Sequence, residues 1–270
     1  FGAGQRLEAL YRDSPRHAMV LLGAQPVWNP TRWPERVRAH GSLRAQLHRA
    51  RNKGVRVAEW PTARASGSPA LQRVLREWLA SRGLPTLHFL VEPETLGRLW
   101  DRRIFVATRG GDPVAFLIAS PIPARNGWLV EQFVRGHSAP NGSVEAMIDA
   151  AMGALSVSGA EYVTLGLAPL SRHSPPVVIH NPLWLAGTLG WLRAHGRRFY
   201  NFGGLDSFKA KLDPDHWEPV FAISASPRFT PRTLYAIAAA FSAGSPATLV
   251  VRALARAARQ EAAWLRKRAG

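Results

Sequence analysis

The chain contains no cysteine, only four lysines, and about half as many acidic as basic residues. The lack of cysteine excludes disulfide bonds, thiolate zinc sites, iron–sulfur clusters and a cysteine nucleophile. None of the nine histidines has the spacing of a known metal-binding motif, so we expect neither a metal nor a bound cofactor. The first residues lack the apolar stretch of a signal peptide and are interpreted as a domain boundary.

The excess of positive charge indicates which partners the protein can have. With 35 Lys and Arg residues against 18 Asp and Glu residues, the 270-residue chain has a formal net charge of +17. Such a field favours a polyanion, either nucleic acid or an anionic membrane surface. The hydrophobic content of 46% argues against a disordered basic tail, and the length allows one large domain or two small ones.

Two segments concentrate this charge. No acidic residue separates the cations of the first segment, which are Arg44, Arg49, Arg51, Lys53 and Arg56. We expect this segment to be a helix that contacts the phosphates of a nucleic acid or of lipids, whereas a solvated helix face is the ordinary alternative. The second segment, 252–268, has six cations and one acid. It is expected to be either a membrane-surface helix or a solvated terminal helix.

An uncharged stretch at 233–251 approaches the length that a membrane span needs. The residues Ser-Ala-Gly-Ser-Pro at 242–246 interrupt it. We therefore expect two helices, at about 231–241 and 246–268, instead of one membrane-spanning helix.

Hydrophobic periodicity and turn signals predict a mixed α/β (α+β) chain. Strands are expected as a pair within 17–30 that turns at Gly23, and at 55–60, 104–108, 113–119, 127–134, 161–167 and 198–202; helices are expected at 34–50, 70–81, 143–158 and 183–195. From residue 103 onwards, this order is typical of a Gcn5-related acyltransferase. The sequence therefore predicts a tandem of two N-acetyltransferase-like folds, at 1–98 and 99–270, that ends in the basic helix.

Four stretches in register carry a family resemblance: 42–55; 130–135 with 139–142; 165–171; and 200–214 with 217–219. Together they resemble the C-terminal catalytic domain of the phosphatidylglycerol lysyl- and alanyltransferases, the multiple peptide resistance factor family. The resemblance implies an aminoacyltransferase that moves lysine or alanine from aminoacyl-tRNA, its co-substrate, to phosphatidylglycerol or a related lipid. It also implies an anionic membrane as partner, a location at the cytoplasmic face of the cell membrane, a membrane-embedded domain missing from this chain, and a part in resistance to antimicrobial peptides.

Two other functions stay open at this point. The first is an acyl-CoA-dependent N-acyltransferase, which would bind pyrophosphate at the start of the helix that begins near residue 143. The segment 135–142 lacks the usual R/Q-x-x-G-x-G/A pattern, which favours a donor other than CoA. The second is a non-catalytic module that binds tRNA or a membrane.

The resemblance points to Arg135 as a catalytic residue at the end of a strand, although a solvated cation would fit the same position. In the family an acidic residue stands three positions earlier, where this chain has Gln132, with Glu131 beside it. Adjacent strand residues face opposite sides, so Glu131 can replace a group at 132 only if the backbone bulges. If that position binds the α-ammonium group, Gln132 does so with a neutral oxygen, and the amino acid specificity changes.

Lysine is rare in this chain, yet Lys209 and Lys211 stand two residues apart in one motif. The resemblance implies Lys209 near the ester carbonyl or its phosphate neighbour and Lys211 in substrate binding; the alternative is two exposed cations on a loop. We expect Asp206 and Ser207 to cap the turn that presents Lys209. Two further substrate-binding candidates are Asn141, which also suits an ordinary helix start, and Ser171, which lines the acceptor pocket or binds backbone.

Overall fold

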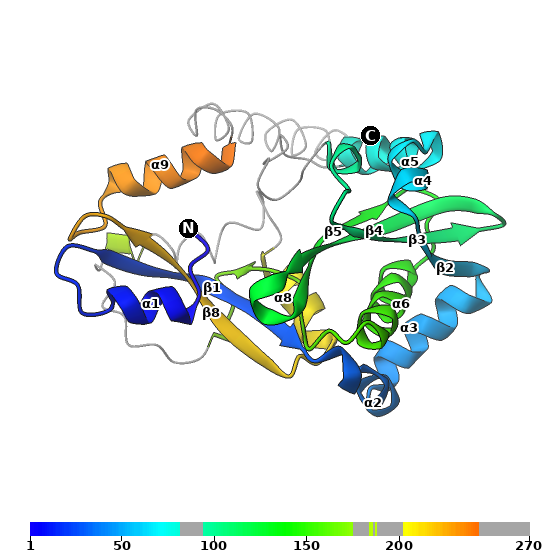
Figure 1. Cartoon of the computed structure of the whole chain (residues 1–270), viewed down its shortest axis with the longest axis horizontal. Coiled ribbons are helices and arrows are strands. Elements are labelled where there is room, and N and C mark those ends of the chain that lie inside the picture. The colour runs from blue at the N-terminus through cyan, green and yellow to red at the C-terminus, as the bar shows by residue number, and fades with distance from the viewer. Residues whose placement is uncertain (82–93, 175–183, 186, 188–201, 243–270) are drawn as a thin grey trace, which may run out of the picture.

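The computed structural model describes residues 1–81, 94–174, 184–185, 187 and 202–242. Within these ranges eight strands form one sheet in the order β2-β3-β4-β5-β6-β1-β7, and β8 pairs with β1 (Figure 1). The strands are β1 (Ala18–Trp28), β2 (Val55–Trp60), β3 (Arg103–Arg109), β4 (Asp112–Ile122), β5 (Gly127–Arg135), β6 (Tyr162–Thr164), β7 (Ala168–Pro169) and β8 (His216–Ser224). The mixed α/β class expected from the sequence is confirmed.

Helices cover both faces of strands β3 to β5, with α5 on one face and α6 and α3 on the other (Figure 1). The helices are α1 (Gln5–Tyr11), α2 (Trp33–Ala39), α3 (Gly41–Asn52), α4 (Thr62–Ser66), α5 (Pro69–Ala80), α6 (Ser143–Val157), α8 (Phe202–Lys211) and α9 (Pro231–Ser242). The long antiparallel pair of β1 and β8 extends away from this layered part.

Helix α5 follows the periodicity of its sequence. Ser68 caps its first turn by accepting a hydrogen bond from the Leu71 backbone N–H at 3.3 Å, and Pro69 occupies the first turn, where its missing N–H costs nothing. The apolar face packs against one side of the sheet, through Leu71, Val74, Leu75 and Trp78. The helix predicted at 70–81 is confirmed to within one residue at each end.

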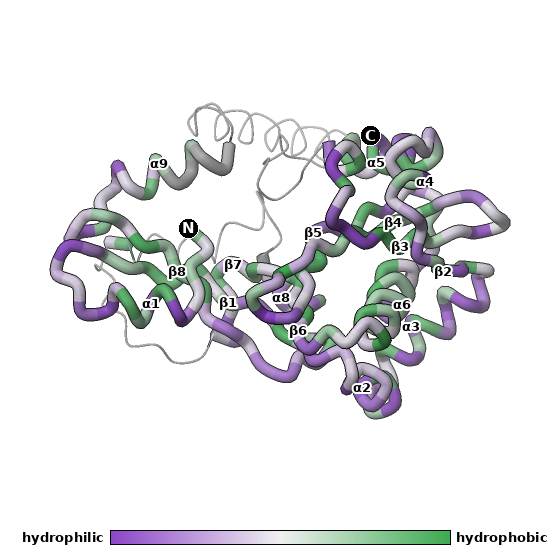
Figure 2. Tube along the Cα trace, viewed as in Figure 1, coloured by the Kyte–Doolittle hydropathy of each residue, from purple (hydrophilic) through white to green (hydrophobic). Residues whose placement is uncertain are grey.

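Helix α6 packs on the opposite side of the same strands. Its buried residues Met147, Ile148, Met152 and Leu155 join a core that includes Phe105 of β3. Strand β3 is thus buried on both faces, because its alternate residues belong to the two different apolar clusters. Figure 2 shows mainly hydrophobic residues along α6 and hydrophilic residues along the outer helix α3.

Strand β1 corrects the expected strand pair within 17–30. It is one strand of eleven residues, with no turn at Gly23. Instead, the β1–β8 register shifts between Leu21 and Gly23, and a Cβ at Gly23 would lie 2.2 Å from the Ala168 carbonyl oxygen of β7. A glycine is therefore required here because the strands pack closely. In the sequence alone, such a glycine looks the same as a turn glycine.

Strands β5 and β6 separate soon after they begin. They pair in parallel from Gly127 to Leu129 on β5 and from Tyr162 to Thr164 on β6. In the described part of the chain, no strand pairs with the rest of β5 along that edge. The separation leaves room for a pocket beside residues 130–135.

Other expectations differ in detail from the structure. The helix expected at 34–50 is divided into α2 and α3 by the extended backbone of His40. Strands from both sides of residue 98 are hydrogen-bonded neighbours, β2 with β3 and β1 with β6. The sheet therefore has no break at that residue, and the tandem division stays a prediction.

The remaining predictions concern the C-terminal part. The helix predicted at 231–241 corresponds to α9. Most of the expected helix 183–195 and strand 198–202, and all of the basic helix 246–268, lie outside the described residues. Among the helices that the structure describes, none has both the length and the apolar character needed to cross a membrane.

Candidate functional site

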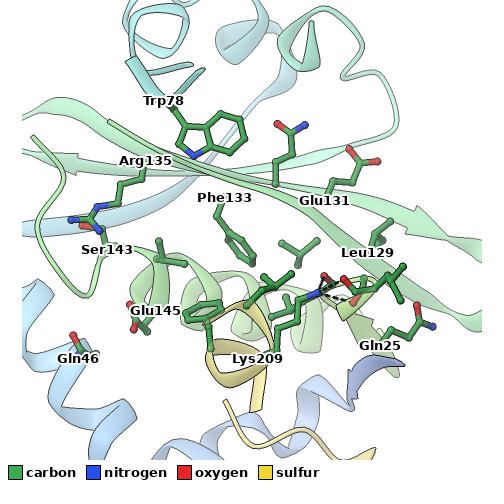
Figure 3. Close-up of a pocket in the computed structure, with 18 of the residues that line it drawn as sticks. Gln25, Gln46, Trp78, Leu129, Glu131, Phe133, Arg135, Ser143, Glu145 and Lys209 are labelled. Atoms are coloured by element: carbon green, nitrogen blue, oxygen red, sulfur yellow. Dashed lines mark hydrogen bonds between the residues drawn. The ribbon is translucent and has the colours of Figure 1, made fainter. Parts of the chain in front are cut away.

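A pocket of about 1000 Å³ lies where β5 separates from β6. It brings together six of the residues selected from the sequence: Arg49, Glu131, Gln132, Arg135, Asn141 and Lys209. Its lining includes side chains from both faces of β5, since Trp78 and Glu131 lie on one side of the strand and Phe133 and Lys209 on the other (Figure 3). Within the described residues, the pocket therefore follows the unpaired edge of β5 from one face of the sheet to the other.

A β-bulge places Glu131 and Gln132 together. On β4, Ile118 pairs with Gln132 but the next residue, Ala119, pairs with Val130, so that Glu131 is the extra residue. The bulge turns two consecutive side chains toward the same face of the sheet, whereas on a regular strand they point to opposite faces. The backbone therefore bulges where Glu131 needs it to in order to replace a group at position 132. The catalytic role of Glu131 stays a prediction.

Arg135 is held in place by the loop that follows β5. Its Nη2 donates to the Ala139 carbonyl oxygen at 3.0 Å and to Asn141 Oδ1 at 3.1 Å, and its Nε donates to Ala139 at 3.3 Å. In the described part of the chain, Nη1 has no protein acceptor. Asn141 therefore positions Arg135, whose remaining N–H groups are available to a carbonyl or phosphate oxygen in the pocket.

Lys209 lies on a helix, α8, and its side chain is buried, with 3% of the residue exposed. Its Nζ donates to three backbone carbonyls, Leu165 at 2.8 Å, Gly166 at 2.8 Å and Leu167 at 2.9 Å. Burial lowers the pKa of Lys209 to about 7, and the Asp206 carboxylate opposes this shift. Because the three carbonyls accept all three ammonium protons, the protonated side chain fixes the segment 165–167 and has no further donor for a substrate.

Asp206 and Ser207 lie within α8 and cap no turn, which corrects the expectation from the sequence. Asp206 instead accepts a hydrogen bond from Ser171 Oγ at 2.6 Å and lies 3.6 Å from Nδ1 of His173. The His173 ring stacks on Trp217, with ring centroids 4.8 Å apart. Ser171 is thus engaged with a carboxylate and lies outside the pocket lining, as does Asp206.

Lys211 also lies outside the lining. Its Nζ is 3.7 Å from Glu145 Oε1, and Glu145 itself lines the pocket from the first turn of α6. Lys211 therefore neutralises a pocket carboxylate in the present arrangement. The predicted direct contact between Lys211 and substrate stays a prediction.

Most of the basic segment forms α3, as expected, but Lys53 caps the helix and Arg56 lies in β2; all of these cations are exposed. Arg49 lines the pocket. Arg44 donates to the backbone carbonyls of Val37 and Arg38 in α2, so its side chain caps the C-terminal end of that helix. Arg51 and Lys53 are exposed on the last turn and the cap of α3, away from the pocket lining.

The first turn of α6 lines the pocket behind a tight contact with α3. Gly142 has φ +92°, and a Cβ there would lie 2.3 Å from the Gln46 carbonyl oxygen. Glu145 adds a negative charge to this first turn. The positive end of the helix dipole thus faces the pocket, but a carboxylate already occupies part of it.

Sequence reasoning missed a polar cluster beside the pocket. Gln25, which lines the pocket, donates through Nε2 to Tyr162 Oη at 2.9 Å and to Glu218 Oε2 at 3.0 Å. Tyr162 also donates to Glu218 at 2.9 Å, and Arg125 donates to its other oxygen at 2.5 Å. The only signal for it was the position of Glu218 within the stretch 217–219.

The charges of this cluster affect one another. Burial raises the pKa of Glu218. Hydrogen bonds from Gln25, Arg125 and Tyr162 lower this pKa by more than burial raises it, so that the net shift is downward. Burial and the neighbouring carboxylate raise the pKa of Tyr162, which keeps its hydroxyl protonated. The cluster ties β1, β6 and β8 together with fixed side-chain orientations.

The described residues include no group of three or more His, Asp or Glu side chains that is arranged to hold a metal ion. The sequence-based expectation that the reaction needs no metal or resident cofactor stays a prediction. The arrangement offers cationic and neutral hydrogen-bonding groups around a large space, which suits binding and orienting anionic substrates.

Comparison with known proteins identifies the family. The model for "Phosphatidylglycerol lysyltransferase, C-terminal" matches residues 36–224. The chain belongs to the phosphatidylglycerol lysyltransferase C-terminal family. This membership confirms the resemblance and indicates a transferase of the lysylphosphatidylglycerol synthetase type. No curated protein sequence matches the chain.

Solved structures share the fold of this lysyltransferase-family chain. The C-terminal domain of a putative lysylphosphatidylglycerol synthetase from Agrobacterium fabrum is 23% identical, with a TM-score of 0.67 over 88% of this chain and 70% of that one. L-PGS from Bacillus licheniformis is 21% identical, with a TM-score of 0.65 over 90% and 72%. A conserved protein of unknown function from Bacteroides thetaiotaomicron gives 14% identity and a TM-score of 0.53 over 82% and 68%.

Proposed function

We propose that this chain transfers an aminoacyl group from aminoacyl-tRNA to a hydroxyl group of phosphatidylglycerol. The observation that carries the proposal is the pocket beside residues 129–135 of β5, which is lined from both faces of that strand. Such a pocket allows two large substrates to reach one point from different sides. Both substrates are anionic, in agreement with the net charge of +17.

The reaction is an exchange of esters. The glycerol oxygen forms a bond to the acyl carbon, the bond from that carbon to the ribose oxygen breaks, and the proton of the glycerol hydroxyl passes to the ribose. An ester already has a usable leaving group, so the protein mainly has to orient the substrates and stabilise the negative charge on the carbonyl oxygen.

Arg135 is the best candidate for stabilising that charge. Ala139 and Asn141 hold its guanidinium through Nε and Nη2, and Nη1 remains for the oxyanion or for a phosphate. Lys209 supports the reaction through the segment 165–167, whose carbonyls it holds. This role differs from the direct contact with the ester that the resemblance implied.

The basic helix α3 is proposed to bind tRNA phosphates. Its residue Arg49 lines the pocket, so that a backbone bound along α3 would end at the reaction site. The lipid substrate implies an anionic membrane surface, a location at its cytoplasmic face, and a membrane-embedded domain as partner. Resistance to cationic antimicrobial peptides would follow from the positive charge added to the lipid.

Transfer can be measured with phosphatidylglycerol vesicles and tRNA carrying radiolabelled lysine, alanine or arginine. We expect lipid-extractable label with at least one of them. Arg135→Ala should reduce the rate by roughly 10²- to 10³-fold, as expected for loss of an oxyanion donor. Arg109→Ala, an exposed arginine at the end of β3, is the matched control and should leave the rate unchanged. No label from any aminoacyl-tRNA would reject the proposal.

An acyl-CoA-dependent N-acyltransferase is the second candidate, because the first turn of α6 lines the pocket and suits a pyrophosphate. The contact between Gly142 and Gln46 and the carboxylate of Glu145 disfavour that use. Tight CoA binding in a thermal-shift assay, together with no aminoacyl transfer, would favour this candidate. If Arg135→Ala and Lys209→Ala changed only binding, a non-catalytic tRNA- or membrane-binding module would be favoured instead.

A further inference from the structure

The described part of the pocket contains two carboxylates, Glu131 and Glu145. Glu131 accepts a hydrogen bond from Ser120 Oγ at 2.5 Å and lies 3.5 Å from Nη2 of Arg102. Glu145 lies 3.7 Å from Nζ of Lys211. Both carboxylates therefore already face a cation of the protein.

The residues outside the described ranges add few acids. The segment 175–201 has none, and only Glu92 and Glu261 occur in the other two long segments. Three arginines, by contrast, line the pocket, Arg49, Arg102 and Arg135, together with Lys209, whose pKa is lowered to about 7 by burial. The field within the pocket thus opposes the binding of additional positive charge.

Gln132 provides a neutral acceptor in the same place. The residue lines the pocket and is buried, with 6% exposed, and its Oε1 has no hydrogen-bond partner. A buried oxygen without a donor is unfavourable, so the side chain is suited to a ligand that brings one N–H donor group.

We propose that the pocket selects an aminoacyl group with an uncharged side chain, such as alanyl, and that Gln132 Oε1 accepts a hydrogen bond from its α-amino group. A lysyl group would bring a second ammonium among these basic side chains, and both carboxylates that line the described part of the pocket already face a cation. Removing such a charge from water without a partner is strongly unfavourable. This inference rests on the proposed function and names its amino acid class.

The first test compares alanyl- and lysyl-tRNA as donors to phosphatidylglycerol vesicles. We expect kcat/KM for alanyl transfer to exceed that for lysyl transfer by at least about tenfold. Equal use of the two donors, or a preference for lysyl, would overturn the inference and leave the proposed function intact. Absence of transfer from every aminoacyl-tRNA would reject the proposed function, and the binding test below would then decide the inference.

Three variants locate the selectivity. Gln132→Glu adds a carboxylate and should raise lysyl relative to alanyl transfer by about tenfold or more. Gln132→Met removes the acceptor at similar volume and should lower both rates. Gln72→Glu makes the same chemical change as the first variant on an exposed site of α5, and should change neither. An unchanged lysyl-to-alanyl ratio in a folded Gln132→Glu protein would contradict the assignment.

Binding can be followed without any transfer. Alaninamide and lysinamide mimic the two aminoacyl groups, and the side-chain amide signal of Gln132 in 15N-labelled protein reports on both. We expect alaninamide to shift this signal, and lysinamide to do so only at about tenfold higher concentration. A shift by lysinamide at the same or lower concentration would overturn the inference, as would no shift of this signal by either compound.

Discussion

Strands β2 to β5 and the pair β1/β8 belong to one sheet, but they are stabilised in different ways. The first part has helices on both faces and two large clusters of buried apolar residues. The second part has a small apolar cluster around Val20, Ala222 and Phe229, next to the hydrogen-bonded group around Glu218. The pocket lies between the two parts, at the short junction of β5 and β6.

This difference shows how the site is built. The apolar part holds β5, and therefore Arg135, against a dense core that tolerates little movement. The polar part fixes side-chain directions, because hydrogen bonds are directional whereas apolar contacts are not. If this comparison is right, substitutions in the two parts should destabilise the protein for different reasons, by leaving a cavity in the first part and by leaving a charge without a partner in the second.

The largest effect on stability is expected for Phe116→Ala in β4. Phe116 is fully buried in the cluster beneath α5, so its truncation leaves a cavity and should reduce the free energy of unfolding by roughly 3 to 5 kcal/mol. Denaturant unfolding followed by circular dichroism measures this loss. Val157→Ala, whose side chain is 91% exposed, is the control and should change stability by less than about 0.5 kcal/mol.

A smaller loss, roughly 2 to 3 kcal/mol, is expected for Glu218→Ala, because Arg125 would remain partly buried without its partner. The exposed Glu161→Ala is its control. Since the pKa of Glu218 is lowered in the folded protein, its stabilisation is present above the unfolded pKa and is lost as pH falls through the folded pKa. A difference between wild type and Glu218→Ala that persists unchanged at acidic pH would contradict this.

Because of Lys209, we expect the free energy of unfolding to depend on pH above neutrality. Burial lowers the pKa of Lys209 to about 7, so between that pH and the ordinary lysine pKa the unfolded chain binds more protons than the folded protein. Stability then rises with pH, by roughly 1 kcal/mol per pH unit relative to Lys209→Met. Unfolding of both proteins at several values above neutral pH measures the difference. Parallel pH curves for the two proteins would show that Lys209 keeps its proton throughout this range.

The smallest effect is expected at the outer edge of the apolar part. Arg103 of β3 donates two hydrogen bonds to Glu59 of β2, each of 2.7 Å, at an exposed position. Glu59→Gln should reduce stability by less than about 1 kcal/mol, and salt should weaken the effect. A loss as large as that of Glu218→Ala would remove the distinction between surface and junction charges.

Local patterns were sufficient for much of the apolar part. The periodic residues of α5 and the turn at 110–111 between β3 and β4 are local signals, and the structure follows both. The role of Gly23 is not a local signal, because it depends on Ala168, which is far away in sequence. The pairing of β1 with β6 and β8 is likewise non-local, and no periodicity within β1 specifies its partners.

The sequence predicted which residues lie in the site better than it predicted the contacts that they make there. Arg135, Gln132 and Lys209 all reach the pocket. Their bonding could not be read from the sequence, since the acceptors of Lys209 lie more than forty residues away. The bulge at Glu131 arises from its register with β4, and the cluster around Glu218 depends on four separate segments.

The contact at Gly142 has a mechanical consequence. Its Cα lies so close to the Gln46 carbonyl of α3 that no larger residue fits, and the neighbouring Asn141 holds Arg135. A larger residue at position 142 would therefore displace this loop from α3, and with it the Asn141 oxygen that orients the guanidinium. The placement of Arg135 thus depends on the packing of the basic helix, although the two lie far apart in the sequence.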